Sequence, residues 1–477
     1  MSRDFSDERV WIRQTESASY GQSSSEGWAD MGHKTSTTIA DDLVRGLLHD
    51  AGLDHLRYGT TEWNPLGDLI RPGDKVVVKP NWVAHKNRLS SAGIECLVTH
   101  RSVIQAVLHY IVKTRPGQII IADAPIQGCD FDALQRECRI ESVLAHFRSM
   151  GHNIEVRDLR LTTLPSRFGR HKRIYPDAGR YCLFNLGDKS RLAPITHDHS
   201  EFRVTLYEPE LMKQHHHPGR HEYLVAGDVI EADVVFNLPK LKTHKKAGMS
   251  GALKNAVGIV GFKEYLPHHR KGGSDSGGDC YEGRSFLKCM AENALDRANS
   301  SSNMILKYLN ARLAGLVIRL NRRLRKEVQD LEGSWHGNDT VWRTCLDIQT
   351  ILHYGDREGQ LSDVPQRKVI TITDAIVAGE GDGPLAPSPV PLRTMTFGTN
   401  VAALDWIHCL LMGLDPCKIP LVANAFKKDA WPLAWFQPDN IRVYVNGNIL
   451  PDTRTVGRFG RSFCPSAGWR GHCEMLD

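Results

Sequence analysis

The sequence predicts an α/β protein with a mostly parallel, Rossmann-like open sheet, helices on both faces, and helical and irregular insertions. Three observations lead to this prediction. Short runs rich in Val and Ile recur between turn residues, as strands buried on both faces of a parallel sheet do. A helical pattern separates two of these runs, giving the order strand, helix, strand. The 477 residues are 41% hydrophobic and 24% charged, typical of a globular protein with a sizeable core.

Six apolar runs are the expected strands, and three segments have the 3.6-residue apolar period of a helix. The first helix is expected at 39–51, another at 99–113 between two strands, and a third at 401–412. The expected strands are 75–78, 119–122, 154–156, 229–236, 369–372 and 441–445.

The chain is expected to form one α/β domain over residues 39–477, after a polar, Ser/Thr-rich and flexible N-terminal arm over residues 1–38. Two insertions are predicted, at about 160–225 and 264–332. The Gly-rich segment 264–282 is typical of a mobile binding loop or lid. The segment 284–332 reads as helix and is basic around NRRLRK. A basic amphipathic helix can contact membranes or a partner, but we favour a solvated helix face.

Composition excludes several classes of protein. A formal charge of +5 is small for this length and does not predict a nucleic-acid-binding protein. The N-terminus lacks the apolar core of a signal peptide, and we find no transmembrane segment, so the expected location is the cytoplasm. The eleven cysteines form no CxxC pair. They are predicted to be reduced thiols, and no ferredoxin-type iron–sulfur cluster is expected.

Polar residues follow four of the expected strands. Lys79 and Asn81 follow the first, Asp123 the second, the run 237–244 the fourth and Asp374 the fifth. Ligands of an open parallel sheet bind beyond the carboxyl ends of its strands. We therefore predict one shared site there. The alternative is ordinary turn chemistry, since Pro, Asn, Asp and Gly end strands in most proteins.

The segment PKLKTHKKAGMSGALKN is the sharpest motif. Its lysines, among them Lys240, Lys242 and Lys254, alternate with His244, Asn255 and glycines that let a backbone approach a ligand closely. Ammonium and exposed N–H groups suit phosphate or carboxylate. Neither GxxxxGK[ST] nor a GxGxxG after a strand occurs, so neither a P-loop nor a dinucleotide fold is indicated. The alternative is a solvated lysine-rich loop.

Carboxylates form a second group of candidates. Oxygen ligands of this kind suit Mg²⁺ or Mn²⁺, which would also screen an anionic substrate, and iron is less favoured. An equally open alternative is that Glu380 and Asp382 shape a Gly-rich turn and that Asp405 caps, or faces out from, the helix expected at 401–412. The predicted metal ligands are Asp123, Asp374, Glu380, Asp382 and Asp405.

Two further blocks carry functional side chains. The block 335–343 includes Asn338 and Arg343, which could hydrogen-bond a substrate. The alternative is a helix N-cap at Asn338 or Asp339 with Trp342 buried. The run 215–217 is three adjacent histidines, which we interpret as loop residues, because adjacent imidazoles cannot all face one ion.

Four motifs resemble the bacterial and archaeal family called domain of unknown function 362. They are VVVKPNW, DVVFNLPKLKTHKKAGMSGALKNAVGIVG, TITDAIVAGEGDGP and AALDWIHCLLMGLDP, and the resemblance covers roughly residues 70–425. It implies an α/β core with the motifs gathered on one side. Many relatives are iron–sulfur proteins with ferredoxin-like cysteines, which this chain lacks. The block SWHGNDTVWRTCLDI is similar to longer, cluster-free members. The family has no settled reaction.

The leading hypothesis is an enzyme that acts on a small phosphorylated or carboxylated metabolite by metal-assisted group transfer, ligation or isomerisation in a biosynthetic pathway. His244 is the candidate for proton transfer because an imidazole titrates near neutrality. A redox protein with an iron centre or external electron donor, and a non-catalytic anion sensor, are the alternatives. The predicted catalytic residues are His244, Lys242 and Asp374, and the predicted substrate-binding residues are Lys79, Asn81, Lys240, Lys254, Asn255, Asn338 and Arg343.

Overall fold

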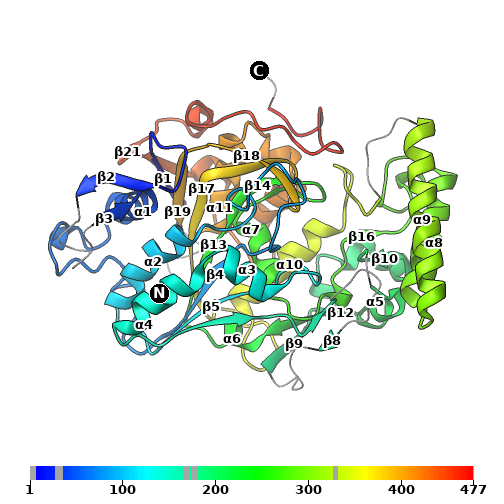
Figure 1. The fold of residues 1–477 in the computed structure, drawn as a ribbon, viewed down its shortest axis with the longest axis horizontal. Coiled ribbons are helices and arrows are strands. Elements are labelled where there is room, and N and C mark those ends of the chain that lie inside the picture. Colours follow the sequence, from blue (N-terminus) through cyan, green and yellow to red (C-terminus); the bar gives the residue numbers. More distant parts are fainter. Residues whose placement is uncertain are drawn as a thin grey trace.

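A computed structural model describes residues 7–26, 36–164, 172–173, 180–205, 207–325 and 331–475. The main sheet occupies the middle of the molecule, with helices on both sides, and helices α8 (Phe286–Ser300) and α9 (Met304–Arg325) stand together at one end (Figure 1). The strand order is β21-β20-β1-β19-β17-β13-β4-β5-β6. The predicted α/β fold with a mostly parallel sheet is confirmed.

Five neighbouring strands, from β17 in the middle of the sheet to the edge strand β6, are parallel. β13 lies between β4 and β17, and its Asn237 is in register with Lys79 of β4 and Thr371 of β17. This register places the ends of the three strands at one edge. The five strands are β6 (Ile154–Asp158), β5 (Gln118–Asp123), β4 (Lys75–Pro80), β13 (Val234–Leu238) and β17 (Lys368–Asp382).

The carboxyl edge of the sheet is extended by β17, which is 15 residues long and continues past the end of β13. β14 (Lys240–His244) follows Pro239, pairs with this extension and brings Lys240 opposite Asp374. β15 (Gly248–Ser250) turns back onto β14, and β18 (Ala386–Val390) turns back onto β17. The PKLKTH motif is therefore a short strand at the edge of the sheet where a ligand is expected.

Helices bury both faces of the sheet, as the continuous apolar strands predict. Val76 and Val78 of β4 face one hydrophobic core, with α1 (Ile39–Asp50), α2 (Arg101–Lys113) and α4 (Ile140–Ser149). Val77 faces the other core, with α7 (Ala252–Asn255), α10 (Val341–Tyr354) and α11 (Val401–Leu411).

The remaining strands of the main sheet are β19 (Thr394–Gly398), β1 (Arg9–Gln14), β20 (Arg442–Val445) and β21 (Asn448–Ile449). The short elements are β2 (Gln22–Glu26), β3 (Ser36–Thr38), α3 (Phe131–Glu137), β7 (Thr162–Thr163), β8 (Lys172–Arg173), β9 (Tyr181–Asn185), β10 (Phe202–Arg203), α5 (Pro209–His215), β11 (His216–His217), β12 (Arg220–Ala226), α6 (Gly227–Ile230), β16 (His269–Arg270) and α12 (Pro420–Ala423).

Three expectations need correction. The N-terminal arm is wrong for Arg9–Gln14, because these residues form β1, hydrogen-bonded between β19 and β20 inside the sheet; residues 1–6 and 27–35 lie outside the described residues. The strand expected at 229–236 begins only at Val234, since Gly227–Ile230 form α6. The helical insertion at 284–332 is two helices, α8 and α9, broken near Ser301.

All eleven cysteines are free thiols, as predicted from the lack of paired spacings. In the part of the chain that the structure describes, none of the helices combines the length and apolar character that crossing a bilayer requires. The cytoplasmic location stays a prediction.

Candidate functional site

Asn81, Lys242 and Asp374, which are far apart in the chain, meet at the carboxyl edge of the sheet. The Lys242 ammonium donates to Asn81 Oδ1 and, over 2.7 Å, to the carbonyl of Leu97. Lys240, two residues earlier on β14, lies 2.7 Å from Asp374 Oδ2. The predicted convergence of the strand ends is therefore present, but these side chains bind one another in the interior.

A second buried pair joins β4 and β5. Lys79 Nζ lies 2.8 Å from Asp123 Oδ1 and donates to the carbonyl of Pro80 and to Asn255 Oδ1. Asn255 Oδ1 also accepts a hydrogen bond of 3.0 Å from Asn81. Lys79 and Asp123 are 1% and 3% exposed, so this network links β4, β5 and α7 away from solvent. We call Lys79, Asn81, Asp123, Lys240, Lys242, Asn255 and Asp374 the strand-end network.

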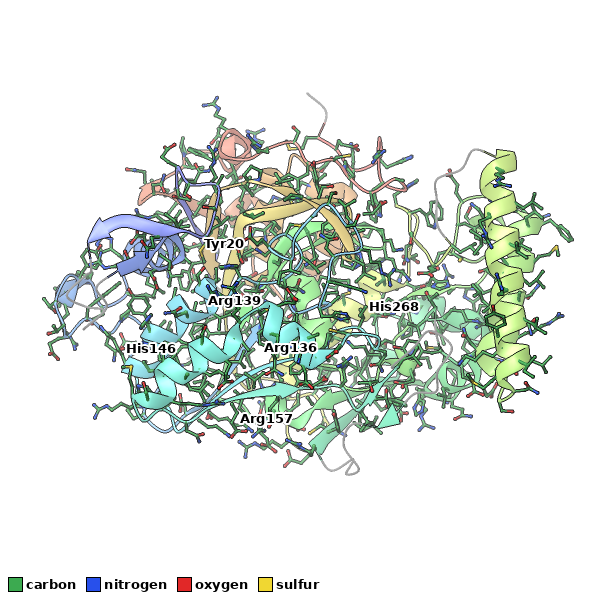
Figure 2. All side chains as sticks on the ribbon, in the orientation of Figure 1. Tyr20, Arg136, Arg139, His146, Arg157 and His268 are labelled. Atoms are coloured by element: carbon green, nitrogen blue, oxygen red, sulfur yellow. The ribbon has the colours of Figure 1, made fainter. Side chains whose placement is uncertain are left out.

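Tyr20 completes the strand-end network from the N-terminal segment. Its hydroxyl donates to Asp374 Oδ1 over 2.5 Å and accepts from Lys240 Nζ, and its ring stacks on His100 at 3.9 Å between centroids. Figure 2 shows Tyr20 over the region of β17 and β19. The sequence did not indicate Tyr20, because it lies in a polar, Ser-rich segment without apolar periodicity.

Burial changes the acidity of the lysines in this network. Burial, followed by the charge of Lys240, lowers the pKa of Lys242 to about 7. Lys242 has polar neighbours but no carboxylate within ion-pair distance among the described residues, whereas Lys240 and Lys79 each contact one. Lys242 is consequently the lysine of the network whose charge changes near neutral pH.

Five side chains beyond the network form what we call the lysine–histidine cluster: His244, Lys246, Lys254, Lys263 and His268. They come from β14, the loop after it, α7 and the segment before β16. Figure 2 shows His268 beside α10. Lys254 and Lys263 are half-buried, and within the described residues neither ammonium group has a hydrogen bond or salt bridge. The pKa of His244 is lowered first by burial and then by Lys254 and Lys246, which shows that these groups lie within electrostatic reach.

The two histidines of the cluster have opposite hydrogen-bonding roles. His244 Nδ1 accepts from the N–H groups of Lys246 and Ala247 at 3.1 Å each, so the proton of the neutral ring is on Nε2. His268 Nδ1 lies 2.6 Å from the carbonyl oxygen of Leu266, which can only accept. The proton of His268 is therefore on Nδ1, and its Nε2 carries the lone pair.

The cluster keeps both histidines neutral. Burial, then Lys246 and Lys254, hold the pKa of His268 well below its usual value, as they do for His244. Burial also lowers the pKa of Lys263 to about 7, although the Asp123 carboxylate opposes the shift. Below about pH 7 the cluster thus combines a neutral proton donor, a neutral proton acceptor and a cationic Lys263, an arrangement suited to an anionic ligand.

The five predicted metal ligands do not come together. Asp405 is fully buried and accepts from the N–H groups of Ala252 and Leu253 at 2.7 and 2.8 Å, so it anchors the start of α7. Gly251 must lack a side chain there, since a Cβ would stand 2.1 Å from Asp405 Oδ1. Glu380 accepts from the N–H of Cys464, and Asp382 is exposed at the end of β17.

Within the described residues, a single group of His, Cys, Asp or Glu side chains has ligand atoms close enough for one metal ion. It consists of His269, Cys280 and Glu292 and contains none of the five predicted carboxylates. The predicted Mg²⁺ or Mn²⁺ set is therefore not assembled. Asp123 and Asp374 instead bind buried lysines.

The side chains of Asn338 and Arg343 bind neighbouring groups of the protein. Asn338 Oδ1 accepts from the N–H groups of Thr340 and Val341 at the start of α10, while its amide donates to the carbonyl of His268. Arg343 pairs with Asp339 at 3.1 Å and lies over the Trp342 ring. The N-cap of α10 is Thr340, not Asn338 or Asp339 as the alternative expected, although Trp342 is buried as it expected.

Sequence reasoning missed Lys263 and His268. Lys263 directly precedes the Gly-rich segment 264–282 and His268 lies near its start, and neither residue belongs to a periodic pattern. The one available signal was their proximity in sequence to GALKN, which ends at Asn255.

The sequence profile described as domain of unknown function (DUF362) matches residues 200–409, which include β14, α7, β16 and α10. Residues 200–409 are thus similar to the domain of unknown function 362. The predicted resemblance is confirmed for this range, which is shorter than the expected 70–425. The domain contains all five residues of the cluster and both Asp374 and Asp405, whereas Tyr20, Lys79, Asn81 and Asp123 precede it.

A curated relative is the thylakoid-associated protein of Synechocystis sp., which is 22% identical over 383 residues, covering 80% of this chain and 77% of the relative. Two solved structures also align. A Thermotoga maritima protein is 12% identical with a TM-score of 0.29, and the lactate racemase apoprotein of Thermoanaerobacterium thermosaccharolyticum is 11% identical with a TM-score of 0.31. The alignments cover 72% and 78% of this chain, which spans about half of each solved chain, 52% and 55%.

Proposed function

We propose that the lysine–histidine cluster is the active site of an enzyme that transfers a proton on a small metabolite bearing a carboxylate or phosphate. The observation that carries this proposal is the opposite protonation of the two neutral imidazoles beside two ammonium groups without a partner among the described residues.

Lys254 and Lys263 would hold the anionic group. Removing a charged group from water without a partner costs on the order of several kcal/mol, so a half-buried ammonium favours binding of an anion. The two lysines differ in this respect from Lys79 and Lys240, whose charges are matched by Asp123 and Asp374. We accordingly assign Lys79, Asn81, Lys240, Lys242, Asn255 and Asp374 to positioning the loop that carries the cluster.

The histidines would perform the chemistry. Nε2 of His268 accepts the proton from the carbon next to the carboxylate, and the bond electrons move onto the carboxylate or carbonyl oxygen. The Nε2–H of His244 donates a hydrogen bond to that developing charge, and the lysines stabilise it. Return of the proton from His268 to the same face of the carbon regenerates His268, and exchange of the His268 proton with solvent in between replaces the hydrogen on that carbon. His244, which we predicted as the residue for proton transfer, would then act as a hydrogen-bond donor.

The test is exchange of a carbon-bound hydrogen with D₂O. The protein is incubated with a panel of 2-hydroxy acids, amino acids and sugar phosphates, and loss of the α-proton signal is followed by NMR. At least one compound should exchange with the natural protein and the His146→Gln control, an exposed histidine on α4. His268→Gln should abolish the exchange. Exchange that survives in His268→Gln, or no exchange with any compound, would contradict the proposal.

A second candidate function, association with a membrane surface, is favoured by α9. Five leucines recur along it at alternating intervals of three and four residues, and each is 45–57% exposed. They form one stripe, while α9 packs on α8. The 22 residues of α9 include six Lys or Arg and no Asp or Glu. The stripe consists of Leu306, Leu309, Leu313, Leu316 and Leu320.

An anionic lipid surface is the proposed occupant, because a basic helix with an exposed apolar stripe fits the boundary between lipid headgroups and acyl chains. Two copies of α9 packed together would bring like charges close, which argues against self-association. The thylakoid association is a property of the Synechocystis relative, and it agrees with this proposal. The basic helix that we had interpreted as a solvated face would then be a binding surface.

Vesicle sedimentation tests this second function. The full chain should sediment with vesicles containing phosphatidylglycerol and not with pure phosphatidylcholine. The double variant Leu313→Glu/Leu316→Glu should lose the binding, and Leu56→Glu, at a residue 85% exposed elsewhere, should retain it. Binding unchanged by the double variant, or a dimer in analytical ultracentrifugation that the double variant abolishes, would contradict it.

A further inference from the structure

A second group of reactive side chains lies outside the lysine–histidine cluster. His269, Cys280 and Glu292 come from β16, the Gly-rich loop and α8, and their ligand atoms all lie within 4.8 Å of one another. The three residues are 5%, 1% and 6% exposed. They line a small hollow of about 30 Å³ between β10, β16 and α8.

Neighbouring backbone groups hold two of the three side chains in place. The Glu292 carboxylate accepts from the N–H of Gly272 at 3.0 Å, and Cys280 Sγ accepts from the N–H of Glu332 at 3.1 Å. His269 is held by its strand, since β16 pairs with β10 with His269 opposite Arg203. The three ligand atoms are thus brought together by contacts that leave each able to bind a further group.

His269 supplies an independent sign that a ligand is missing. Its Nδ1 is buried and has no hydrogen-bond partner among the described residues. A buried polar atom without a partner costs about 1–3 kcal/mol, and few occur in folded proteins. An ion bound by His269, Cys280 and Glu292 would give this nitrogen atom the partner that it lacks.

The charges around the hollow permit a cation. Arg203 and Lys271, which also line it, both contact Asp296, at 2.9 and 2.7 Å. Asp296 therefore offsets one of these two positive charges. A thiolate and a carboxylate would neutralise a divalent ion, which would displace their protons on binding.

We propose that His269, Cys280 and Glu292 bind a zinc ion. Nitrogen, sulfur and oxygen ligands from His, Cys and Glu are the set that zinc takes, and Mg²⁺ or Ca²⁺ would not select a thiolate. Three protein ligands leave a fourth position open toward the hollow, as in sites where zinc binds water or a substrate. This inference does not rest on the proposed proton transfer.

Zinc at this place would organise the neighbouring cluster. His269 follows His268 directly, and Glu332, whose N–H contacts Cys280, lies 3.7 Å from Lys246 through its carboxylate. The ion would fasten the Gly-rich loop to α8 and so fix the position of His268.

The test uses the full chain produced with zinc in the medium and analysed by elemental mass spectrometry, followed by cobalt substitution. One zinc per chain is expected, together with a sulfur-to-cobalt charge-transfer absorption in the cobalt form. Cys280→Ser should lose the absorption. Cys289→Ser should keep it, because Cys289 is exposed and lies on α8, the helix that carries Glu292.

Titration of the metal-free natural protein with cobalt covers the case in which a variant fails to fold. A sulfur-to-cobalt absorption that saturates at one equivalent, with a raised Tm, supports the site. Lack of that absorption in the natural protein, or its persistence in folded Cys280→Ser, would overturn the proposal.

Discussion

The strand-end network and the lysine–histidine cluster are both rich in lysine, but they satisfy their charges differently. In the network, Lys79 and Lys240 lie 2.8 and 2.7 Å from buried carboxylates. In the cluster, Lys254 and Lys263 have no such partner among the described residues. The network combines residues before and within the range 200–409, whereas the cluster lies wholly within that range.

The difference distinguishes a scaffold from a binding site. A buried ion pair whose remaining hydrogen bonds are satisfied has no capacity left for a ligand, and it fixes the geometry of the strands that carry it. Half-buried ammonium groups without a partner carry a cost that an anion would relieve. The comparison therefore predicts opposite effects for the same substitution in the two regions.

Lys79→Met should have the largest effect. It leaves the Asp123 carboxylate buried without its cation, and breaking such a pair costs about 3–5 kcal/mol. Urea unfolding followed by circular dichroism measures this change. Lys75→Met, on the same strand with a partly exposed ion pair, should cost about 0–1 kcal/mol. An equal loss of unfolding free energy in the two variants would contradict the assignment of Lys79 to a buried, structural ion pair.

Tyr20→Phe should have an intermediate effect. The hydroxyl bonds both Asp374 and Lys240 in the interior, and leaving such partners unsatisfied costs about 1–3 kcal/mol. The same urea titration measures it. Ser19→Ala, at the neighbouring exposed position, serves as the control. An unchanged midpoint for Tyr20→Phe would mean that the N-terminal segment does not close the network.

Lys263→Met should change stability in the opposite direction. Removing a half-buried ammonium without a partner should stabilise the ligand-free protein by about 0.5–2 kcal/mol, as substitutions at strained functional sites commonly do. Urea unfolding in chloride buffer shows the sign. Destabilisation of the size found for Lys79→Met would indicate a paired, structural lysine.

A further prediction concerns how the stabilisation by sulfate depends on pH. Because the pKa of Lys263 is lowered to about 7, its ammonium is charged below that pH and neutral above it. Stabilisation by sulfate, whose own charge is constant in this range, should be full below pH 7 and decline as pH rises toward 9. The affinity change corresponds to about 1.4 kcal/mol per pH unit at most. Sulfate stabilisation that is constant from pH 6 to 9 would contradict this assignment.

The sequence predicted the sheet and the meeting of its strand ends, because Val- and Ile-rich runs and terminal Lys, Asn and Asp residues are local features. It could not predict which charges pair. Lys79 and Asp123 are 44 residues apart, and their 2.8 Å contact depends on the order of β4 and β5. Tyr20 and His268 lie in segments without periodicity, so their placement depends on tertiary contacts alone. Asp405 was predicted as a metal ligand. Its actual role is to accept hydrogen bonds from the start of α7, about 150 residues earlier in the chain, and such a long-range contact leaves no local sequence pattern.

Sulfate-induced stabilisation at pH 6.5 tests the central claim most directly. The Tm of the natural protein, of Lys254→Met/Lys263→Met and of Lys75→Met is measured in sodium sulfate and in sodium chloride of equal ionic strength, because sulfate also stabilises proteins in general. We predict a larger sulfate increment for the natural protein and Lys75→Met than for the double variant. An equal increment in all three proteins would contradict the assignment of the lysine–histidine cluster as an anion site.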